Sequence, residues 1–186
     1  MEEFTSFLYN KNPLLVLSHL SKNIYKENTA STVSKELNLA ISSVHSILKN
    51  FEKVGLITSR TLGKNVIYDL DKNHPILKPF RIFDNISSLL PIIEKIKPLA
   101  KEIILFGSCA TGEDTVESDV DLFILVDEEQ EKIYEIIDDA ELERELSLNV
   151  RKINPIIKST LGFMELERDD EVFWGEIMKG IVLWEV

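Results

Sequence analysis

Apolar side chains near the start of the chain recur every three or four residues, which is the period of an amphipathic helix. The stretches with this period are 13–22, 30–37 and 41–54. Gly55 follows the third stretch, where a glycine that caps a helix is expected. After Gly55 the period becomes that of extended chain, and residues 56–60 and 66–70 flank a turn at 62–65. The pattern predicts three short helices, the last two separated by a tight turn, and then a β-hairpin.

Later in the chain the pattern alternates between short apolar runs and helical stretches. Residues 103–106 and 122–126 are too short, and too closely bounded by Gly, Ser and Asp, to be helices, so we predict two buried strands. A helix is expected at 133–146 and a further strand at 150–157. A helix that ends before Gly180 and a strand at 181–184 complete the pattern. The second half therefore predicts an α/β domain with a mixed sheet, and the whole chain has the α+β fold class.

Between these halves lies an apolar, proline-rich segment. Four of the six prolines fall in it: Pro75, Pro79, Pro91 and Pro98. Because proline interrupts helices, we predict a helical connector in several pieces, packed on one of the modules or on a second copy of the chain in a homodimer. The predicted organisation is 1–74 as an N-terminal module, 75–98 as the connector and 99–186 as the second domain.

Residues 13–70 resemble a winged helix-turn-helix DNA-binding domain. The resemblance implies that the third helix enters the major groove of double-stranded DNA and that the tip of the hairpin reaches phosphates or the minor groove. The residues expected to contact DNA are Ser42, Ser43, His45, Ser46 and Lys49 on the polar face of that helix, and Arg60 and Lys64 beside the tip. The alternative is a solvated helix and an ordinary hairpin used for dimerisation or protein contacts.

Charge supports two modules with different properties. Residues 1–80 hold ten Lys or Arg and seven Asp or Glu, while residues 81–186 hold eleven and twenty-five, within a net charge of -11. A mildly basic N-terminal module can dock on DNA although the whole chain is acidic. With 44% hydrophobic residues and no apolar run long enough for a bilayer, we expect a cytoplasmic protein without membrane contact. The single cysteine, Cys109, excludes an internal disulfide and a zinc cluster.

Candidate chemistry lies between the two predicted strands at 103–106 and 122–126. Gly107 and Ser108 open this connection, and Asp119 and Asp121 close it. Because side chains alternate along a strand, both aspartates are expected on one face. Two carboxylates suit Mg²⁺, which completes its coordination with phosphate oxygens. Gly107 leaves room for a phosphate, and Ser108 offers a hydroxyl and, at a helix start, backbone N–H groups.

At these residues the chain resembles the minimal nucleotidyltransferases of the DNA polymerase β superfamily, whose signature is Gly-Ser, a spacer of this size and Asp-x-Asp. The resemblance implies that Asp119 and Asp121 hold catalytic Mg²⁺, two ions in an active enzyme, while Gly107 and Ser108 bind ATP or another nucleoside triphosphate. It also suggests a protein acceptor, because minimal relatives act as antitoxins that nucleotidylate HEPN-domain ribonucleases. The alternative is an ordinary turn followed by the polar start of a strand.

Two departures from the family pattern bear on activity. Many relatives have Arg or Lys where this chain has Thr111, and the connection carries several acids that would repel a triphosphate unless a metal or a distant lysine neutralises them. Active relatives have a third acid on a later strand, where this chain is expected to have Asn154. An amide cannot accept a proton as a general base, so transfer should be slow or absent. Asp138 and Asp139 could substitute, but both are expected to be solvated on a helix.

Two functions are therefore consistent with the sequence. The first is a DNA-binding regulator whose second domain binds Mg²⁺ with a nucleoside triphosphate and transfers a nucleotidyl group to a protein or other acceptor. The second is a non-enzymatic transcription factor in which a degenerate transferase domain serves dimerisation, nucleotide sensing or partner binding. Asn154 and Thr111 favour the second function, and the intact Gly-Ser and Asp-x-Asp pairs favour retained metal binding.

Overall fold

A computed structural model describes residues 11–127, 130–145 and 151–186 of the chain. The chain divides into two compact units, Met1–Leu77 and Lys78–Val186. The boundary falls at the first turn of helix α5 (Leu77–Ile96), so most of the segment expected as a connector is a helix of the second unit. Residue 146, the expected last residue of a helix, and residue 150, the expected first residue of a strand, lie outside the described residues.

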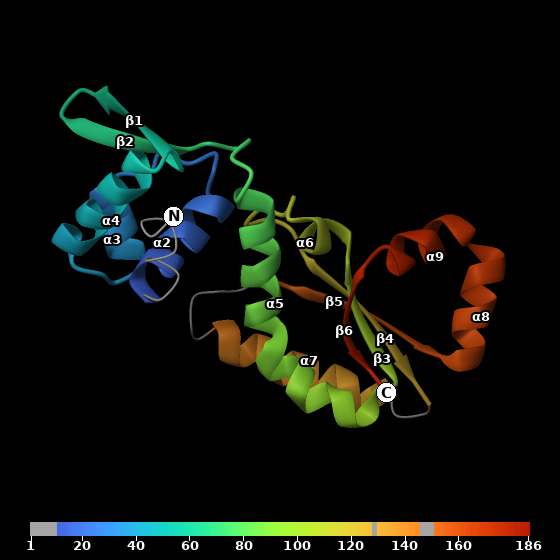
Figure 1. Cartoon of the computed structure of the whole chain (residues 1–186). Coiled ribbons are helices and arrows are strands. Elements are labelled where there is room, and N and C mark those ends of the chain that lie inside the picture. Colours follow the sequence, from blue (N-terminus) through green and yellow to red (C-terminus); the bar gives the residue numbers. More distant parts are fainter. Residues whose placement is uncertain (1–10, 128–129, 146–150) are drawn as a thin grey trace. The chain divides into compact units, whose positions relative to one another are not determined.

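In the first unit, the described residues 11–77 form a helical region followed by a hairpin, as the periodicity predicted (Figure 1). The elements are α2 (Lys11–Lys22), α3 (Ala30–Glu36), α4 (Ile41–Lys53), β1 (Ile57–Leu62) and β2 (Asn65–Leu70). Strands β1 and β2 pair antiparallel, and Leu62 opposes Asn65 across the turn. Gly55 has a φ of 81°, and the N–H of Leu56 donates to the carbonyl of Phe51, so the predicted glycine cap of α4 is confirmed.

Helix α4 buries one side against the rest of the first unit. Val44, Ile47, Leu48 and Phe51 are buried, which agrees with the spacing of apolar residues in the sequence. Ile41, the first residue of the helix, is by contrast exposed, with an exposed fraction of 55%. The opposite face of α4 is left to solvent.

The second unit contains a mixed sheet with the strand order β5-β4-β3-β6 among the described residues. The strands are β3 (Glu102–Phe106), β4 (Val120–Val126), β5 (Ile153–Ser159) and β6 (Ile181–Glu185). Strand β3 runs antiparallel to both β4 and β6, whereas β4 and β5 are parallel. The predicted mixed sheet is confirmed. A short helix, α6 (Gly107–Thr111), begins the connection from β3 to β4.

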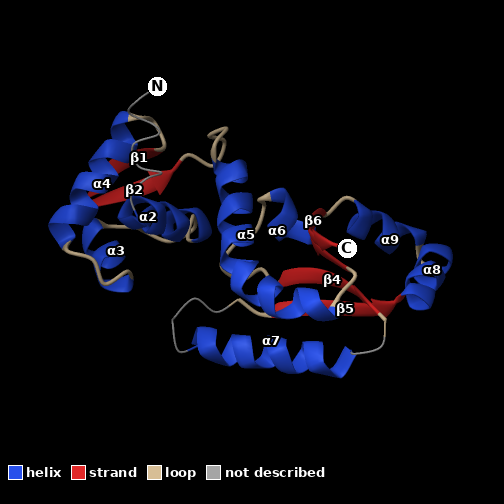
Figure 2. Cartoon of the chain, turned by 60° about the horizontal axis from the view of Figure 1, so that its bottom comes forward, coloured by secondary structure: helices blue, strands red, loops and turns tan. Residues whose placement is uncertain are grey.

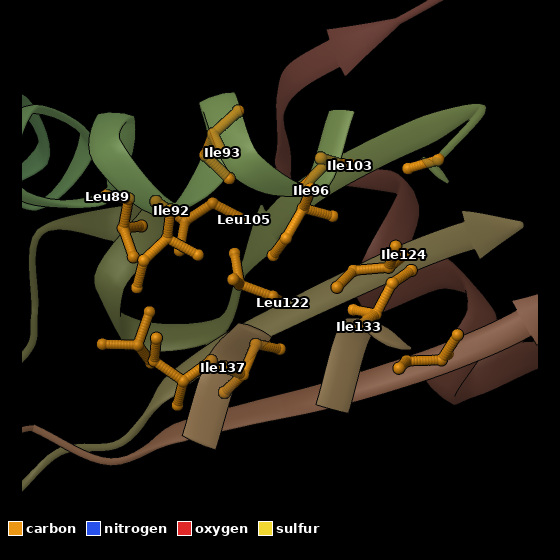
Figure 3. Packing of buried hydrophobic residues seen from close by; sticks show 14 of the residues in the cluster. Leu89, Ile92, Ile93, Ile96, Ile103, Leu105, Leu122, Ile124, Ile133 and Ile137 are labelled. Atoms are coloured by element: carbon orange, nitrogen blue, oxygen red, sulfur yellow. The ribbon is translucent and has the colours of Figure 1, made fainter. Parts of the chain in front are cut away.

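Helices cover both faces of this sheet (Figure 2). Helix α5 and helix α7 (Gln130–Glu145) pack on one face, and α8 (Thr160–Asp169) and α9 (Glu171–Met178) pack on the other. Figure 3 shows the larger core, in which Ile92 and Ile96 of α5 and Ile133 and Ile137 of α7 meet Leu122 of β4. The smaller core, on the opposite face, contains Ile104, Phe106, Phe123 and Ile177. Alternate residues of β3 and β4 therefore enter different cores.

Helix α5 is continuous, so the predicted break into pieces is wrong. Pro79 lies in the first turn, where the missing N–H has no intrahelical partner in any case. Pro91 lies inside the helix and removes one backbone hydrogen bond to the carbonyl of Ser87. Both Pro91 and Ser87 are exposed, which allows water to satisfy that carbonyl. In the described part of the chain, no helix combines the length and the hydrophobicity needed to cross a bilayer.

Candidate functional site

Three neighbouring strands bring the predicted motif residues to one level of the second unit's sheet. In the register of the sheet, Asp121 of β4 is opposite Phe106 of β3, the residue before Gly107. Asp121 is also opposite Asn154 of parallel strand β5. Val120, which precedes Asp121, is buried in the core under α5 and α7. By alternation, the side chains of Asp121 and Asn154 lie on the other face of the sheet, which α8 and α9 cover in part.

Gly107 lies directly against Asp121. Its φ of 68° belongs to the left-handed region, which side chains disfavour. A Cβ atom added to Gly107 would lie 2.6 Å from Oδ2 of Asp121. The backbone conformation favours glycine here, and a larger residue would also displace the Asp121 carboxylate from its present position. The two halves of the sequence motif, the Gly-Ser pair and the second aspartate, are in contact in the folded domain.

Asn154 donates a hydrogen bond from Nδ2 to Oδ1 of Asp121, with 2.9 Å between the two atoms. The sequence pattern predicted Asn154 at the position of a third acid, and the parallel register puts it beside Asp121. An amide at this point satisfies one carboxylate oxygen without adding negative charge. It can neither accept a proton nor add a charged ligand for a cation.

Asp119 is exposed and immediately precedes β4. Its backbone is fixed, because its carbonyl oxygen accepts a hydrogen bond from the Cys109 thiol at 3.3 Å. The next residue, Val120, donates its N–H to the carbonyl oxygen of Lys152 at 2.9 Å. Asp119 lies two residues before Asp121, which is the spacing from which the sequence predicted one shared face. Ser108, the other predicted phosphate-binding residue, lies in α6 next to Gly107 and is half-buried.

The residues at this point fit a magnesium ion that arrives with a phosphorylated ligand. Within the described ranges, no group of three or more His, Cys, Asp and Glu side chains could hold a metal ion. A cation at Asp119 and Asp121 would therefore depend on oxygen atoms from a ligand or water. Mg²⁺ has this preference, since it commonly binds one or two carboxylates together with substrate phosphates. The space that a Cβ of Gly107 would fill lies beside one of these carboxylates.

Two acids of the connection between α6 and β4 are paired with cations, which the sequence could not show. Glu113 forms an exposed ion pair with Lys78, with 2.5 Å between Nζ and Oε1. The hydrogen bond and the positive charge of Lys78 lower the pKa of the Glu113 carboxyl. Asp114 is completely buried and pairs with Arg151 at 2.6 Å. The expected repulsion of a triphosphate is therefore reduced by cations from α5 and from the segment that leads into β5.

Two residues that contact this connection could not be found from the sequence. Arg151 and Asn85 both bond to Asp114, yet they lie 37 and 29 residues from it in the chain. A single arginine before a strand and a single asparagine in a helix carry no motif. A buried aspartate needs a partner, so knowing that Asp114 is buried would have pointed to these two residues. Burial, however, is decided by the tertiary structure and is not visible in the sequence.

The residues expected to contact DNA lie in the first unit. Ser42, Ser43, His45, Ser46 and Lys49 are all exposed on α4. The three serines line a surface pocket of about 460 Å³ together with Asn12, Pro13, Ile47 and Asn50. The pocket walls carry hydroxyl and amide groups but no formal charge. The structure thus brings the α4 residues to one accessible face.

The predicted hairpin residues differ from each other in their surroundings. Lys64 is exposed in the turn between β1 and β2. Arg60 bonds through Nε to Asp69 of β2 at 2.9 Å, and its Nη2 lies 3.6 Å from a carboxylate oxygen of Glu27. Two acids compete for the Arg60 guanidinium, so a phosphate would have to displace them. Lys49 and Lys64 are better placed than Arg60 for new ionic contacts.

Comparison with known proteins finds a family match for part of the chain. Residues 86–173 match the family described as "Nucleotidyltransferase domain", and this range contains Gly107, Ser108, Asp119, Asp121 and Asn154. No curated protein matches the chain. A solved structure, described as "Crystal Structure of hypothetical protein PyrSV_gp04 from Pyrobaculum spherical virus", is 13% identical and aligns over 77% of this chain and 75% of that chain, with a TM-score of 0.31.

Proposed function

Since residues 86–173 form a polymerase β-like nucleotidyltransferase domain, we propose that this chain is a DNA-binding regulator whose second unit binds Mg²⁺ together with a nucleoside triphosphate. Asp119 and Asp121 hold the metal ion. Gly107 and Ser108 receive the phosphates. The observation that carries this proposal is the contact between Asp121 and Gly107, which places a carboxylate beside a residue that has no side chain to block a phosphate.

The bound metal ion would neutralise phosphate charge and orient the triphosphate. The protein's own residues have separate tasks in this scheme. Asp121 is held at Oδ1 by Asn154, so its Oδ2 remains on the side of Gly107. Lys78 and Arg151 offset the acids of the connection that follows α6. These contacts support binding of an anionic ligand in a domain that is strongly acidic overall.

Asn154 supports a second candidate function, binding of the nucleotide without transfer. A general base within reach of the acceptor contributes about 10²- to 10⁴-fold to a reaction of this kind. Asn154 lies at the place of that base and donates to Asp121 instead of accepting a proton. In this version the nucleotide acts as a signal for the regulator. Exposure of Asp138 and Asp139 on α7 gives no support to either as a replacement base.

Calorimetric titration with ATP in the presence of Mg²⁺ tests the proposal. We expect saturable heat with the parent protein, and affinity reduced at least about 100-fold in the double variant Asp119→Ala, Asp121→Ala, because the metal loses both carboxylates. Asp138→Ala, Asp139→Ala is the matched control, since it removes the same charge from the same unit. Equal binding by the parent and the Asp119, Asp121 variant would contradict the assigned site.

Transfer is tested separately by incubating the protein with labelled ATP and candidate protein acceptors, including a HEPN-domain ribonuclease. A labelled acceptor supports the transferase version, and nucleotide binding without label supports the sensing version. Gel filtration with light scattering measures whether the chain is a homodimer under the same conditions. The readouts are independent, because binding, transfer and association have separate signals.

DNA binding by the first unit is proposed from its three helices and hairpin between Lys11 and Leu70 and from the exposed polar face of α4. We expect Lys49→Ala and Lys64→Ala each to reduce the slope of log affinity against log salt by about one unit, as expected for loss of one phosphate contact. Arg60→Ala should have a smaller effect, because Asp69 and Glu27 already hold that side chain.

Fluorescence anisotropy with a labelled duplex, measured over a range of salt concentrations, gives these slopes. Lys35→Ala is the control, since Lys35 is exposed on α3 rather than on the proposed DNA face. An unchanged slope in both the Lys49 and Lys64 variants would remove the support for this interface. Absence of binding at low salt would leave the first unit without a DNA-binding role.

A further inference from the structure

A closed polar network lies beside the connection from α6 to β4. Oδ1 of Asp114 accepts a hydrogen bond from Asn85 Nδ2 at 3.0 Å, and Oδ2 accepts one from Arg151 Nη1 at 2.6 Å. Nη2 of Arg151 in turn donates to Oδ1 of Asn85. Each of the three side chains is therefore bonded to the other two. The members come from α5, from the connection after α6 and from the segment that leads into β5.

Because these side chains are buried, the loss of any one of them is expected to be costly. Asp114 is fully buried, and only 10% of the Arg151 side chain is exposed. A buried ion pair adds little net stability, because removing both charges from water offsets most of their attraction. Loss of one partner is costly, however, since it leaves the other charge buried and unpaired. Such a network fixes the relative positions of its members more than it stabilises the domain.

The same network is bonded to the proposed nucleotide site through Cys109 in α6. Asn85 Nδ2 also donates to the carbonyl oxygen of Cys109 at 3.1 Å, and Arg151 Nη1 donates to its Sγ at 3.3 Å. The thiol donates onward to the carbonyl oxygen of Asp119 at 3.3 Å. Cys109 is fully buried, so the chain of contacts that runs through it is shielded from water.

From this geometry we propose that Arg151 is a positioning residue of the nucleotide site, which holds α6 and the backbone of Asp119 in place through Asp114, Asn85 and Cys109. The inference rests on the proposed nucleotide-binding function. In this role Arg151 does not contact the carboxylates of Asp119 and Asp121, which would bind the metal ion. Arginine suits the role, because a planar guanidinium donates in several fixed directions at once. Figures 1 and 2 both show α6 beside α5, the helix that supplies Asn85.

Two variants test the inference without leaving an unpaired buried charge. Arg151→Lys keeps the positive charge but replaces the planar fork with a single ammonium group. The double variant Asp114→Asn, Arg151→Gln removes both charges and keeps hydrogen-bonding groups. We expect affinity for Mg²⁺-ATP to fall about 10- to 100-fold in the double variant, as is usual when groups that orient metal ligands are changed. Arg151→Lys should give an intermediate loss.

Hydrogen–deuterium exchange provides a readout that does not require nucleotide. We expect faster exchange of backbone amides in residues 107–121 of both variants, with exchange in β3 and α7 unchanged. Ile137→Val is the control for a general loss of stability, because Ile137 is buried in the core and has no polar group. Glu113→Gln is the control for the same connection, because its pair with Lys78 is exposed. Neither control should selectively speed exchange in residues 107–121, because neither touches the network of Arg151, Asp114 and Asn85.

The possible results separate this inference from the proposed function. Unchanged exchange in residues 107–121 overturns the positioning role, whether or not the protein binds nucleotide. Unchanged affinity in the double variant overturns it as well when the parent protein binds Mg²⁺-ATP. If the parent protein binds no nucleotide, the proposed function fails, and the exchange data alone decide whether Arg151 holds this segment.

Discussion

Replacing Asn154 with Asp should create nucleotidyl transfer, or raise its rate by about 10²- to 10⁴-fold, which is the usual contribution of a general base. Asn154 lies beside Asp121 across parallel strands and donates to its carboxylate at 2.9 Å. A carboxylate at the same position can accept the proton of an acceptor hydroxyl. It also increases the negative charge available to a cation, which the amide cannot do.

The same substitution should have an opposite effect on the protein without metal. Two carboxylates in place of a carboxylate and its hydrogen-bond donor repel each other, and one of them takes up a proton more readily. Because Asn154 is exposed, we expect a loss of only about 1 kcal/mol in the free energy of unfolding. Mg²⁺ should reverse this loss by binding both acids, so the melting temperature of the variant should respond to Mg²⁺ more than that of the parent protein.

Incubation with labelled ATP and an acceptor measures transfer, and thermal unfolding with and without Mg²⁺ measures the metal effect. Asn154→Ala is the matched control, since it removes the hydrogen bond without adding charge, and it should show neither transfer nor a larger Mg²⁺ response. If Asn154→Asp and Asn154→Ala behave alike in both measurements, position 154 does not complete a metal and base site in this domain.

Gly112→Ala should destabilise the second unit by about 3 kcal/mol or more, from backbone strain and from a steric clash together. Gly112 has a φ of 70°. An added Cβ would lie 2.5 Å from the carbonyl oxygen of Lys78 and 2.9 Å from its Cα atom. These atoms belong to the backbone of α5 and cannot rotate away. The first turn of α5 and the connection after α6 would have to move apart, which also breaks the packing around Asp114.

Gly107→Ala is an informative comparison in the same unit. Its φ of 68° is nearly the same, but the added Cβ would meet the end of the Asp121 side chain, which can turn aside. We expect Gly107→Ala to lose Mg²⁺-ATP binding with less loss of stability than Gly112→Ala. Both tryptophans of the chain, Trp174 and Trp184, lie in the second unit, so urea unfolding followed by tryptophan fluorescence reports on that unit.

Gly63→Ala is the control for the first unit. Gly63 has a φ of 62° with no atom within 4 Å of an added Cβ, so this substitution has only the cost of the backbone conformation. It should leave the tryptophan transition unchanged. If Gly112→Ala and Gly107→Ala shift the midpoint of that transition equally, the clash with the Lys78 backbone does not add to the loss of stability.

Local features of the fold were predictable from the sequence because they depend on neighbouring residues. The glycine cap at Gly55 and the strands on either side of Gly107 depend on local backbone preferences and on short apolar runs. The alternation of Val120 and Asp121 follows from the two-residue period of a strand. These local rules are sufficient to group the Gly-Ser pair and the two aspartates into one candidate site.

The prediction that α5 is broken at its prolines was wrong, because the sequence pattern shows only the backbone hydrogen bond that a proline removes. The helix continues through Pro91, since its apolar residues Leu89, Ile92, Ile93 and Ile96 pack on the sheet and the affected carbonyl is exposed. Burial of this apolar face outweighs the lost bond. Packing against a distant strand is not visible in the local pattern.

The sequence by itself determined the strand-turn-strand motif and the glycine at its turn, and it predicted an amide where the family resemblance implies a third acid. Only the tertiary structure decided which cations meet the acids around that motif. Lys78 reaches Glu113, and Arg151 joins Asp114 to Asn85, over separations of 29 to 66 residues. Backbone preferences are local, whereas an ion pair exists only where the packing of the sheet and its helices brings two distant side chains together.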